Sequence, residues 1–335
     1  MPNRETQRHL MAQGYQIERC VYNSFDTLER DADIEKLGTV LQEVKDQAGR
    51  HPIFTLNFLT RNPDFEKIKA TDYQGYFSKS VLDTYLNNRG SEQVFQLIQN
   101  GIKEGVFFPQ FHGREHLDVT KWMTLLQQQH PDFIRLFNLQ MWGFGPKLIP
   151  DLTFNIQAAL ASQGVLASAN QESMLREGMA DFEALFGFRS RSFIPTNFVI
   201  SDSHKSVLAQ EGVIGLQGER FELGNAGGKQ FRYTGQRNAF RQVNWVRNVS
   251  FELLENQGRD LVSQSLREIE TAFRWGKPAV VTSHRINFVG GLNQKSADQG
   301  IESLGTLLKM IVAKWPDVEF VHAHDLIDIL NANGR

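Results

Sequence analysis

Short apolar runs alternate along the chain with longer segments of helical periodicity, and turn residues separate the two. This alternation is typical of units in which a strand, a crossover helix and a parallel strand follow one another, so it predicts an α/β fold. Seven apolar runs are the predicted strands, at residues 17–23, 53–59, 106–111, 193–200, 213–216, 279–282 and 318–321. That many strands indicate a barrel or a nearly closed sheet.

Helical periodicity is clearest over residues 33–47, which end near Gly49, and over residues 300–314. Residues 117–187 also have mainly helical periodicity and are too long for one crossover, so they predict a helical insertion. Residues 218–248 are rich in Gly, Arg and Asn and lack periodicity, which predicts a long loop over one end of the barrel. The whole chain, 1–335, is expected to form a single barrel domain that carries these two features.

Composition narrows the class of protein. Hydrophobic residues make up 41% of the 335 residues and charged residues 22%, which argues against disorder. A formal net charge of -2 without a long basic run gives no electrostatic reason to expect a nucleic-acid partner. No apolar run approaches the ~18 residues of a membrane span, and the N-terminus lacks the apolar core of a signal peptide. We therefore expect a cytoplasmic protein with no membrane partner, and the oligomeric state is left open.

The sharpest chemical signal is a pair of histidines after the strand predicted over residues 106–111. His112 and His116 end the segment FFPQFHGREH, four positions apart. Imidazoles at this spacing can converge on one ion where the backbone turns or runs as a helix, and zinc takes such ligands. Parallel barrels place their active sites at the carboxyl ends of the strands. The pair predicts a divalent metal site, with two surface-loop histidines as the alternative.

Residues 112–116 also match the sequence patterns of two other metalloenzyme classes. The H-x-x-E-H pattern of one metalloprotease class puts both histidines on one helix face and would make Glu115 the general base. A strand that runs directly into His112, with Gly113 next, argues against that helix. The H-x-R-E arrangement of zinc carboxypeptidases would instead make Glu115 a metal ligand.

The strand predicted over residues 279–282 leads to another histidine, His284. An imidazole titrates close to neutral pH, so His284 is predicted to donate a proton to the leaving group of a hydrolysis reaction. The alternative is a histidine that backbone carbonyls satisfy at the barrel rim. Arg285 and Asn287, in the same segment, are assigned to substrate binding.

Polar side chains follow other predicted strands as well. Asp26 would supply the carboxylate that a two-histidine site lacks, or else cap the next helix, with Glu29 completing a capping box. Asn197 would donate a hydrogen bond to a sugar or acyl oxygen, or only pack at its strand end. His322 and His324 follow the last predicted strand, and His324 is expected to begin the final helix.

The order of these motifs resembles that of the polysaccharide deacetylase superfamily, the NodB-like carbohydrate esterases, over most of the chain. The corresponding segments here are Ser24-Phe25-Asp26-Thr27, His112 to His116, Phe193-Ile194-Pro195-Thr196 and Ser283-His284. Residues 57–58 with 62–65, 110–117 and 283–288 are similar to a divergent bacterial branch of the same superfamily. The resemblance implies an irregular (β/α)7 barrel and metal-assisted hydrolysis of an acetyl group.

The resemblance further implies that Asp26, His112 and His116 hold a divalent metal, with zinc as the default ion, and that Asp26, Glu115 and His284 carry the catalysis. Thr27 stands where the superfamily has a second aspartate, and the arginine of its arginine-proline-proline strand is not present. The predicted function is removal of an acetyl group from an N- or O-acetylated sugar or glycan. A catalytically inactive carbohydrate-binding barrel and a zinc carboxypeptidase-like hydrolase are the alternatives.

Overall fold

The computed structural model describes residues 3–223, 228–256 and 258–332. Contacts divide the chain into two compact units. The first consists of residues 1–56, 85–108 and 247–325, and the second of residues 57–84, 109–246 and 326–335. Both units are assembled from interleaved segments, and the single domain expected from the sequence stays a prediction.

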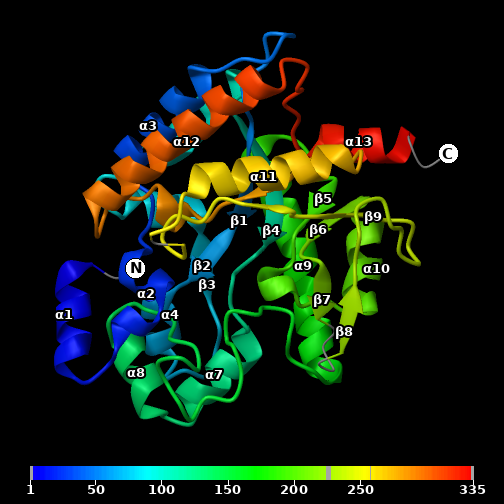
Figure 1. Cartoon of the computed structure of the whole chain (residues 1–335). Helices are drawn as coiled ribbons and strands as arrows, with labels where there is room; N and C mark the ends of the chain where they lie inside the picture. The colour runs from blue at the N-terminus through cyan, green and yellow to red at the C-terminus, as the bar shows by residue number, and fades with distance from the viewer. Residues whose placement is uncertain (1–2, 224–227, 257, 333–335) are drawn as a thin grey trace. The chain divides into compact units, whose positions relative to one another are not determined.

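The elements of the first unit are mainly helical. They are α1 (Arg4–Ala12), η1 (Ile17–Arg19), α2 (Val21–Phe25), α3 (Asp31–Gln42), α6 (Val94–Lys103), β10 (Val249–Ser250), α11 (Leu261–Arg274), β11 (Val281–Thr282), η3 (Arg285–Asn287) and α12 (Gln294–Lys314). The long helices α3, α11 and α12 pack side by side (Figure 1). No helix in the described ranges is both long enough and apolar enough to cross a membrane.

The second unit holds most of the sheet. Its elements are β2 (Arg61–Pro63), α4 (Phe65–Ala70), β3 (Ser78–Ser80), α7 (Val119–Gln127), α8 (Pro131–Asn138), α9 (Val165–Phe186), β5 (Ser192–Phe193), η2 (Thr196–Phe198), α10 (Asp202–Gln210), β6 (Gly215–Gly218), β7 (Phe221–Leu223), β8 (Lys229–Phe231) and β9 (Val243–Val246). Four elements have residues in both units: β1 (Phe54–Leu59), α5 (Val81–Leu86), β4 (Phe107–Gly113) and α13 (Ala323–Ala332).

The main sheet has five strands in the order β1-β4-β5-β6-β9. The pairs from β4 to β9 are parallel, with Phe111 opposite Phe193 and Leu216 opposite Asn244. Helix α9 approaches closely because Gly178 has no side chain, and a Cβ there would lie 2.8 Å from the Phe111 ring. The predicted α/β class is confirmed at the level of a five-stranded sheet flanked by helices.

Four of the predicted strands are found: β1, β4, β6 and the short β11. Residues 17–23 were predicted wrongly, because η1 and α2 form there and the Ser24 hydroxyl donates to the carbonyl of Ile17. Residues 318–321 are also not a strand. The Phe320 N–H donates to the Asp46 carboxylate at 3.1 Å. This side-chain oxygen accepts the hydrogen bond that a backbone carbonyl of a neighbouring strand would accept in a sheet. Hydrophobic runs alone cannot reveal such side-chain partners.

The helical predictions are confirmed more fully. Residues 33–47 and 300–314 correspond to α3 and α12, and residues 117–187 contain α7, α8 and α9. The loop predicted over residues 218–248 is wrong in part, since β7, β8 and the buried sheet strand β9 lie there. Strand β9 has only four residues and includes the polar Asn244, so its apolar pattern is too short to recognise. His324 lies in the first turn of α13, as expected.

A buried histidine on α10 is expected to make the stability of the protein sensitive to pH. His204 is fully buried, its Nε2 lies 3.0 Å from Oε1 of Gln171, and its Nδ1 lies 2.9 Å from the Ser201 hydroxyl. Burial lowers the pKa of His204 to about 4. The unfolded chain, with an ordinary histidine pKa near 6.5, therefore binds more protons than the folded chain between these values.

We expect this histidine to contribute roughly 3 kcal/mol of unfolding free energy above pH 6.5, lost progressively as the pH falls toward 4. Denaturant unfolding at a series of pH values measures the effect. The variant His204→Gln replaces the imidazole by an amide, which forms hydrogen bonds but does not titrate, so its stability should fall less than that of the wild type over this range. Parallel curves for the two proteins would contradict the prediction.

Candidate functional site

The structure distributes the predicted site residues over both units. Asp26, His284, Arg285 and Asn287 belong to the first unit, and His112, Glu115, His116 and Asn197 belong to the second. Within each unit some of these side chains come together in ways that the sequence alone does not reveal.

His284 follows strand β11, which pairs in parallel with β10. In this register Ser250 lies opposite Thr282, and two residues beyond them come Glu252 and His284. Because both strands run in the same direction, their carboxyl ends place these two side chains at one edge. The parallel pairing thus brings a carboxylate to the histidine.

A short hydrogen-bond chain fixes the His284 ring. Its Nδ1 lies 2.7 Å from Oε1 of Glu252, whose side chain is only 5% exposed, whereas that of His284 is 43% exposed. The fully buried Asn287 donates from Nδ2 to Oε2 of Glu252 at 2.7 Å. A carboxylate only accepts, so Nδ1 carries the hydrogen and Nε2 has the lone pair. Asn287 thus contacts Glu252 in this structure, and its predicted role in substrate binding stays a prediction.

Tyr22 of α2 completes the surroundings of this histidine. Its ring stands edge-on to the His284 ring at a centroid distance of 5.2 Å. The hydroxyl donates to Glu255 at 2.8 Å, and burial together with this carboxylate raises the pKa of Tyr22. The phenol is therefore neutral at physiological pH and provides an apolar edge for the imidazole.

Asp26 is the anionic partner of Arg285 in this structure. Nε and Nη2 of Arg285 donate to the two Asp26 oxygens at 2.7 and 3.0 Å, and Nη1 donates to Glu29 at 3.0 Å. Burial lowers the pKa of Arg285, but the two carboxylates more than offset it and hold that pKa above its ordinary value. The helix-capping alternative for Asp26 is wrong, because the next helix, α3, has Arg30 as its N-cap.

In the second unit, His112 and His116 lie beside each other. His112 belongs to β4, and Gly113 turns the chain with a φ of 119°, a conformation that favours glycine. The rings are 5.1 Å apart between centroids and inclined by 72°. This geometry brings the predicted pair together. It rules out the protease pattern, which needs both histidines on one helix, because His112 lies in a strand.

Glu115, predicted as a catalytic residue, lies in a buried ion pair. Its side chain is 2% exposed, and both its oxygens accept from Nε of Arg114 at 2.9 and 2.8 Å. The Tyr76 hydroxyl donates to the same carboxylate at 2.9 Å, and Arg114 also donates to Glu177 at 2.6 Å. Burial raises the pKa of Glu115, while Arg114 acts against that rise. These contacts give Glu115 a structural role in this conformation.

The histidine pair fits a divalent metal in part. Nδ1 of His112 lies 2.7 Å from the Ile194 carbonyl oxygen, so this nitrogen carries the hydrogen and Nε2 has the lone pair. Metal-binding histidines commonly donate their second N–H to such a carbonyl. Asp26, expected as the third ligand, has both oxygens bound to Arg285. Among the described residues no three His, Cys, Asp or Glu side chains form a metal-binding group, and the third ligand stays a prediction.

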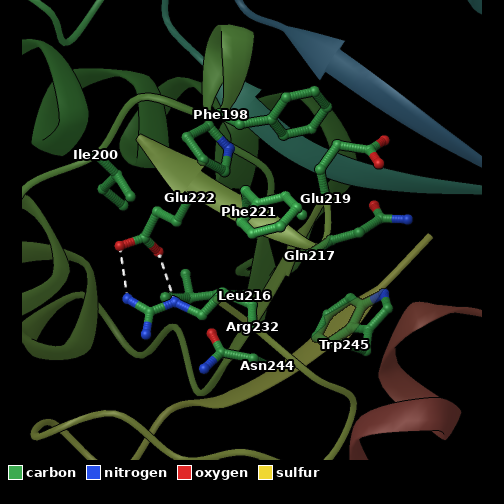
Figure 2. Close-up of a pocket in the computed structure, with 12 residues that line it drawn as sticks. Phe198, Ile200, Leu216, Gln217, Glu219, Phe221, Glu222, Arg232, Asn244 and Trp245 are labelled. Atoms are coloured by element: carbon green, nitrogen blue, oxygen red, sulfur yellow. Dashed lines mark hydrogen bonds and ion pairs between the residues drawn. The ribbon is translucent and has the colours of Figure 1, made fainter. Parts of the chain in front are cut away.

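Asn197 follows β5, which ends at Phe193, well before the predicted strand end at residue 200. The backbone φ of Asn197 is 51° and that of Phe198 is 58°, so two consecutive residues other than glycine are left-handed. Such strained backbone is concentrated at ligand-binding sites. Pro195 and Phe198, on either side of Asn197 in the chain, both line a pocket of this unit (Figure 2).

Glu252 is the side chain next to His284 that sequence reasoning missed. The segment Val249-Ser250-Phe251-Glu252 has the same form as Val281-Thr282-Ser283-His284, two strand residues followed by a polar side chain two positions on. Strands of two residues leave no visible alternation, so the pairing that joins these segments was not apparent.

No family model matches this chain, and no curated protein is significantly similar to it in sequence. The functional argument therefore depends on the side-chain arrangement.

Proposed function

We propose that this protein is a metal-dependent hydrolase that removes an acetyl group from an N- or O-acetylated sugar or polysaccharide in the cytoplasm. The observation that carries the proposal is His284, an exposed imidazole held at Nδ1 by the buried Glu252. A histidine fixed through one nitrogen by a carboxylate is the usual construction of a general acid or base. The paired imidazoles of His112 and His116 add the second feature that such a hydrolase requires.

The proposed architecture is an irregular (β/α)7 barrel. The main sheet supports it because its strand order, β1-β4-β5-β6-β9, rises steadily along the chain. Singly wound barrels have this order, whereas doubly wound sheets reverse direction at a switch point.

Each residue has one role in this proposal. His112 and His116 would hold a divalent metal, zinc by default, which when bound polarises the acyl carbonyl and activates water. His284, in the form with a hydrogen on both ring nitrogens, would give the proton on Nε2 to the leaving sugar oxygen or nitrogen, after which Nε2 has the lone pair. Glu252 keeps the hydrogen of His284 on Nδ1, and Asn287 keeps Glu252 in position.

We expect the purified protein to bind about one divalent ion and the double variant His112→Ala/His116→Ala to lose it, since a site with two of its three ligands removed retains little affinity. Elemental analysis after reconstitution with zinc, cobalt or manganese measures the bound ion. The matched control is His9→Ala, which removes a surface histidine and should leave the metal content unchanged.

Thermal unfolding of the double variant should show a folded protein. A wild-type protein that takes up none of these ions would remove the metal from the proposal. Equal metal content in the wild type and the double variant would place the ion elsewhere in the chain.

A non-catalytic carbohydrate-binding protein is the second candidate, and the Asp26–Arg285 pair favours it. Both Asp26 oxygens accept from Arg285, which leaves the carboxylate poorly suited to bind a metal or take a proton. Acetate release from acetylated chito-oligosaccharides by the metal-loaded protein separates the two candidates. Sugar binding without acetate release would support the non-catalytic one.

A further inference from the structure

Three amide side chains form a row across the second unit. They are Asn57 of β1, Gln110 of β4 and Gln217 of β6, and we call them the amide row. Nε2 of Gln110 donates to Oδ1 of Asn57 at 2.9 Å and to Oε1 of Gln217 at 2.7 Å. An amide nitrogen has two hydrogens, so each neighbour accepts one of them. The central side chain thus holds both outer amides by their oxygens.

Gln110 itself is out of reach of a ligand, but it fixes how Asn57 meets one. Gln110 is completely buried, whereas Asn57 is exposed. Because Oδ1 of Asn57 accepts from Gln110, the NH2 group of Asn57 is left to face away from it. In the described part of the chain, Nδ2 of Asn57 donates to no acceptor. Asn57 therefore offers an accessible donor whose orientation a buried side chain sets.

The amide row lies on the same face of the sheet as the histidine pair. Gln110 and His112 are two residues apart in β4, and Phe111 between them packs against Gly178 of α9. Alternate residues of a strand share a face and lie about 7 Å apart along it. Strand β1 is the neighbour of β4, so Asn57 lies beside Gln110 on that face. A metal ion on the histidine pair and a ligand of three or four heavy atoms would span this distance.

The chemistry of the two groups selects the ligand. A divalent ion held by two neutral imidazoles attracts an anionic oxygen, and the neutral NH2 group of Asn57 donates to an oxygen but cannot donate a charge. A small carboxylate satisfies both, because one oxygen binds the metal and the other accepts from the amide. An amine or an imidazole has no such second acceptor.

We propose that Asn57 is a ligand-binding residue whose Nδ2 donates to an oxygen of a small carboxylate or acyl compound bound at the histidine pair, and that Gln110 is the positioning residue that directs this donor outward. The inference rests on the proposed function only for the metal that His112 and His116 would hold. It needs neither His284 nor hydrolysis, so binding alone tests it.

The full chain loaded with cobalt allows binding to be measured without turnover. Ligands of cobalt change its visible absorption, so titrations with acetate and with imidazole give two affinities for each variant. Acetate has an oxygen left for Asn57, whereas imidazole binds a metal through one nitrogen and keeps a hydrogen on the other. The ratio of the two affinities therefore reports on the amide and not on the metal.

Asn57→Leu removes the donor at nearly constant side-chain size and at an exposed position. Its matched control is Asn138→Leu, which removes another exposed amide of the same unit, at the end of α8. Gln110→Met keeps Asn57 but removes the group that holds its oxygen. Thermal unfolding checks that each variant is folded.

We expect Asn57→Leu to bind acetate at least roughly tenfold more weakly than the wild type and Asn138→Leu, the usual contribution of a hydrogen bond to a charged acceptor. Imidazole should bind to all of them equally. Gln110→Met should also weaken the binding of acetate alone, but by less than Asn57→Leu, since the released amide still points outward for part of the time.

Equal acetate affinity in the wild type and Asn57→Leu would overturn the role of Asn57 and retain the metal site. An equal loss of acetate and imidazole binding would overturn it too, because the amide would then act through the metal. Acetate binding that Gln110→Met leaves unchanged would overturn the role of Gln110. Failure of the wild type to take up cobalt, detected by elemental analysis before any probe is added, would reject the proposed function and this inference together.

Discussion

We expect the change His284→Ala to lower turnover on an acetylated sugar by roughly 10²–10⁴-fold, the usual contribution of general acid–base catalysis. The reason is the fixed ring: Glu252 occupies Nδ1 at 2.7 Å, so Nε2 is the atom that exchanges a proton with the substrate. Steady-state kinetics measure the loss, and elemental analysis should find the metal content unchanged.

The choice of substrate distinguishes proton donation from a structural effect. An aryl acetate has a leaving group that departs without protonation, so His284→Ala should affect it much less than an acetylated sugar. Equal losses on both substrates would deny the acid role, and loss of the metal would make His284 a ligand. Glu252→Gln is the conservative companion, because its amide oxygen still accepts from Nδ1, and it should retain more activity than Glu252→Leu.

The fold could be predicted from the sequence where elements are long or fully apolar. The 21-residue helix α12 and the apolar strand β4 have clear patterns, and both were found. The pattern fails where side chains replace regular backbone partners, as at Phe320. It also fails for very short strands, because β10 and β11 have two residues each and depend on each other for their pairing.

The candidate site could be predicted only as separate strand ends. The pairing of His112 with His116 follows from spacing and the turn at Gly113, and the sequence revealed it. The partners of Asp26 and His284 are set by tertiary contacts: Arg285 is 259 positions from Asp26, and Glu252 is 32 positions from His284. Sequence alone gives the residue types that ionise, and tertiary packing decides which of them face each other.

We expect Arg114→Met to lower the free energy of unfolding by about 3–5 kcal/mol, the usual cost of removing one partner from a buried ion pair. Arg114 is 9% exposed and Glu115 is 2% exposed, so the change leaves a carboxylate in the interior whose one remaining hydrogen-bond donor among the described residues is the Tyr76 hydroxyl. Denaturant unfolding measures the loss. Lys309→Met is the control: its partner Glu43 is 49% exposed, and the expected loss is under ~1 kcal/mol.

The pH dependence of the variant tests the cause. Burial already raises the pKa of Glu115, and without Arg114 that pKa should rise further, because the nearest positive charge is gone. A carboxyl group whose folded pKa is raised destabilises the protein when ionised, so the deficit of Arg114→Met should be complete at high pH and shrink as acid protonates Glu115. The double variant Arg114→Met/Glu115→Gln, which carries no buried charge at this pair, should recover most of the loss at neutral pH.

If Glu115 were instead a catalytic base, Glu115→Gln alone would abolish acetate release while the protein kept its wild-type stability, and the double variant would be inactive as well. Full activity in Glu115→Gln, together with the stability pattern of the other two variants, would establish that Glu115 and Arg114 hold the fold and take no part in the reaction.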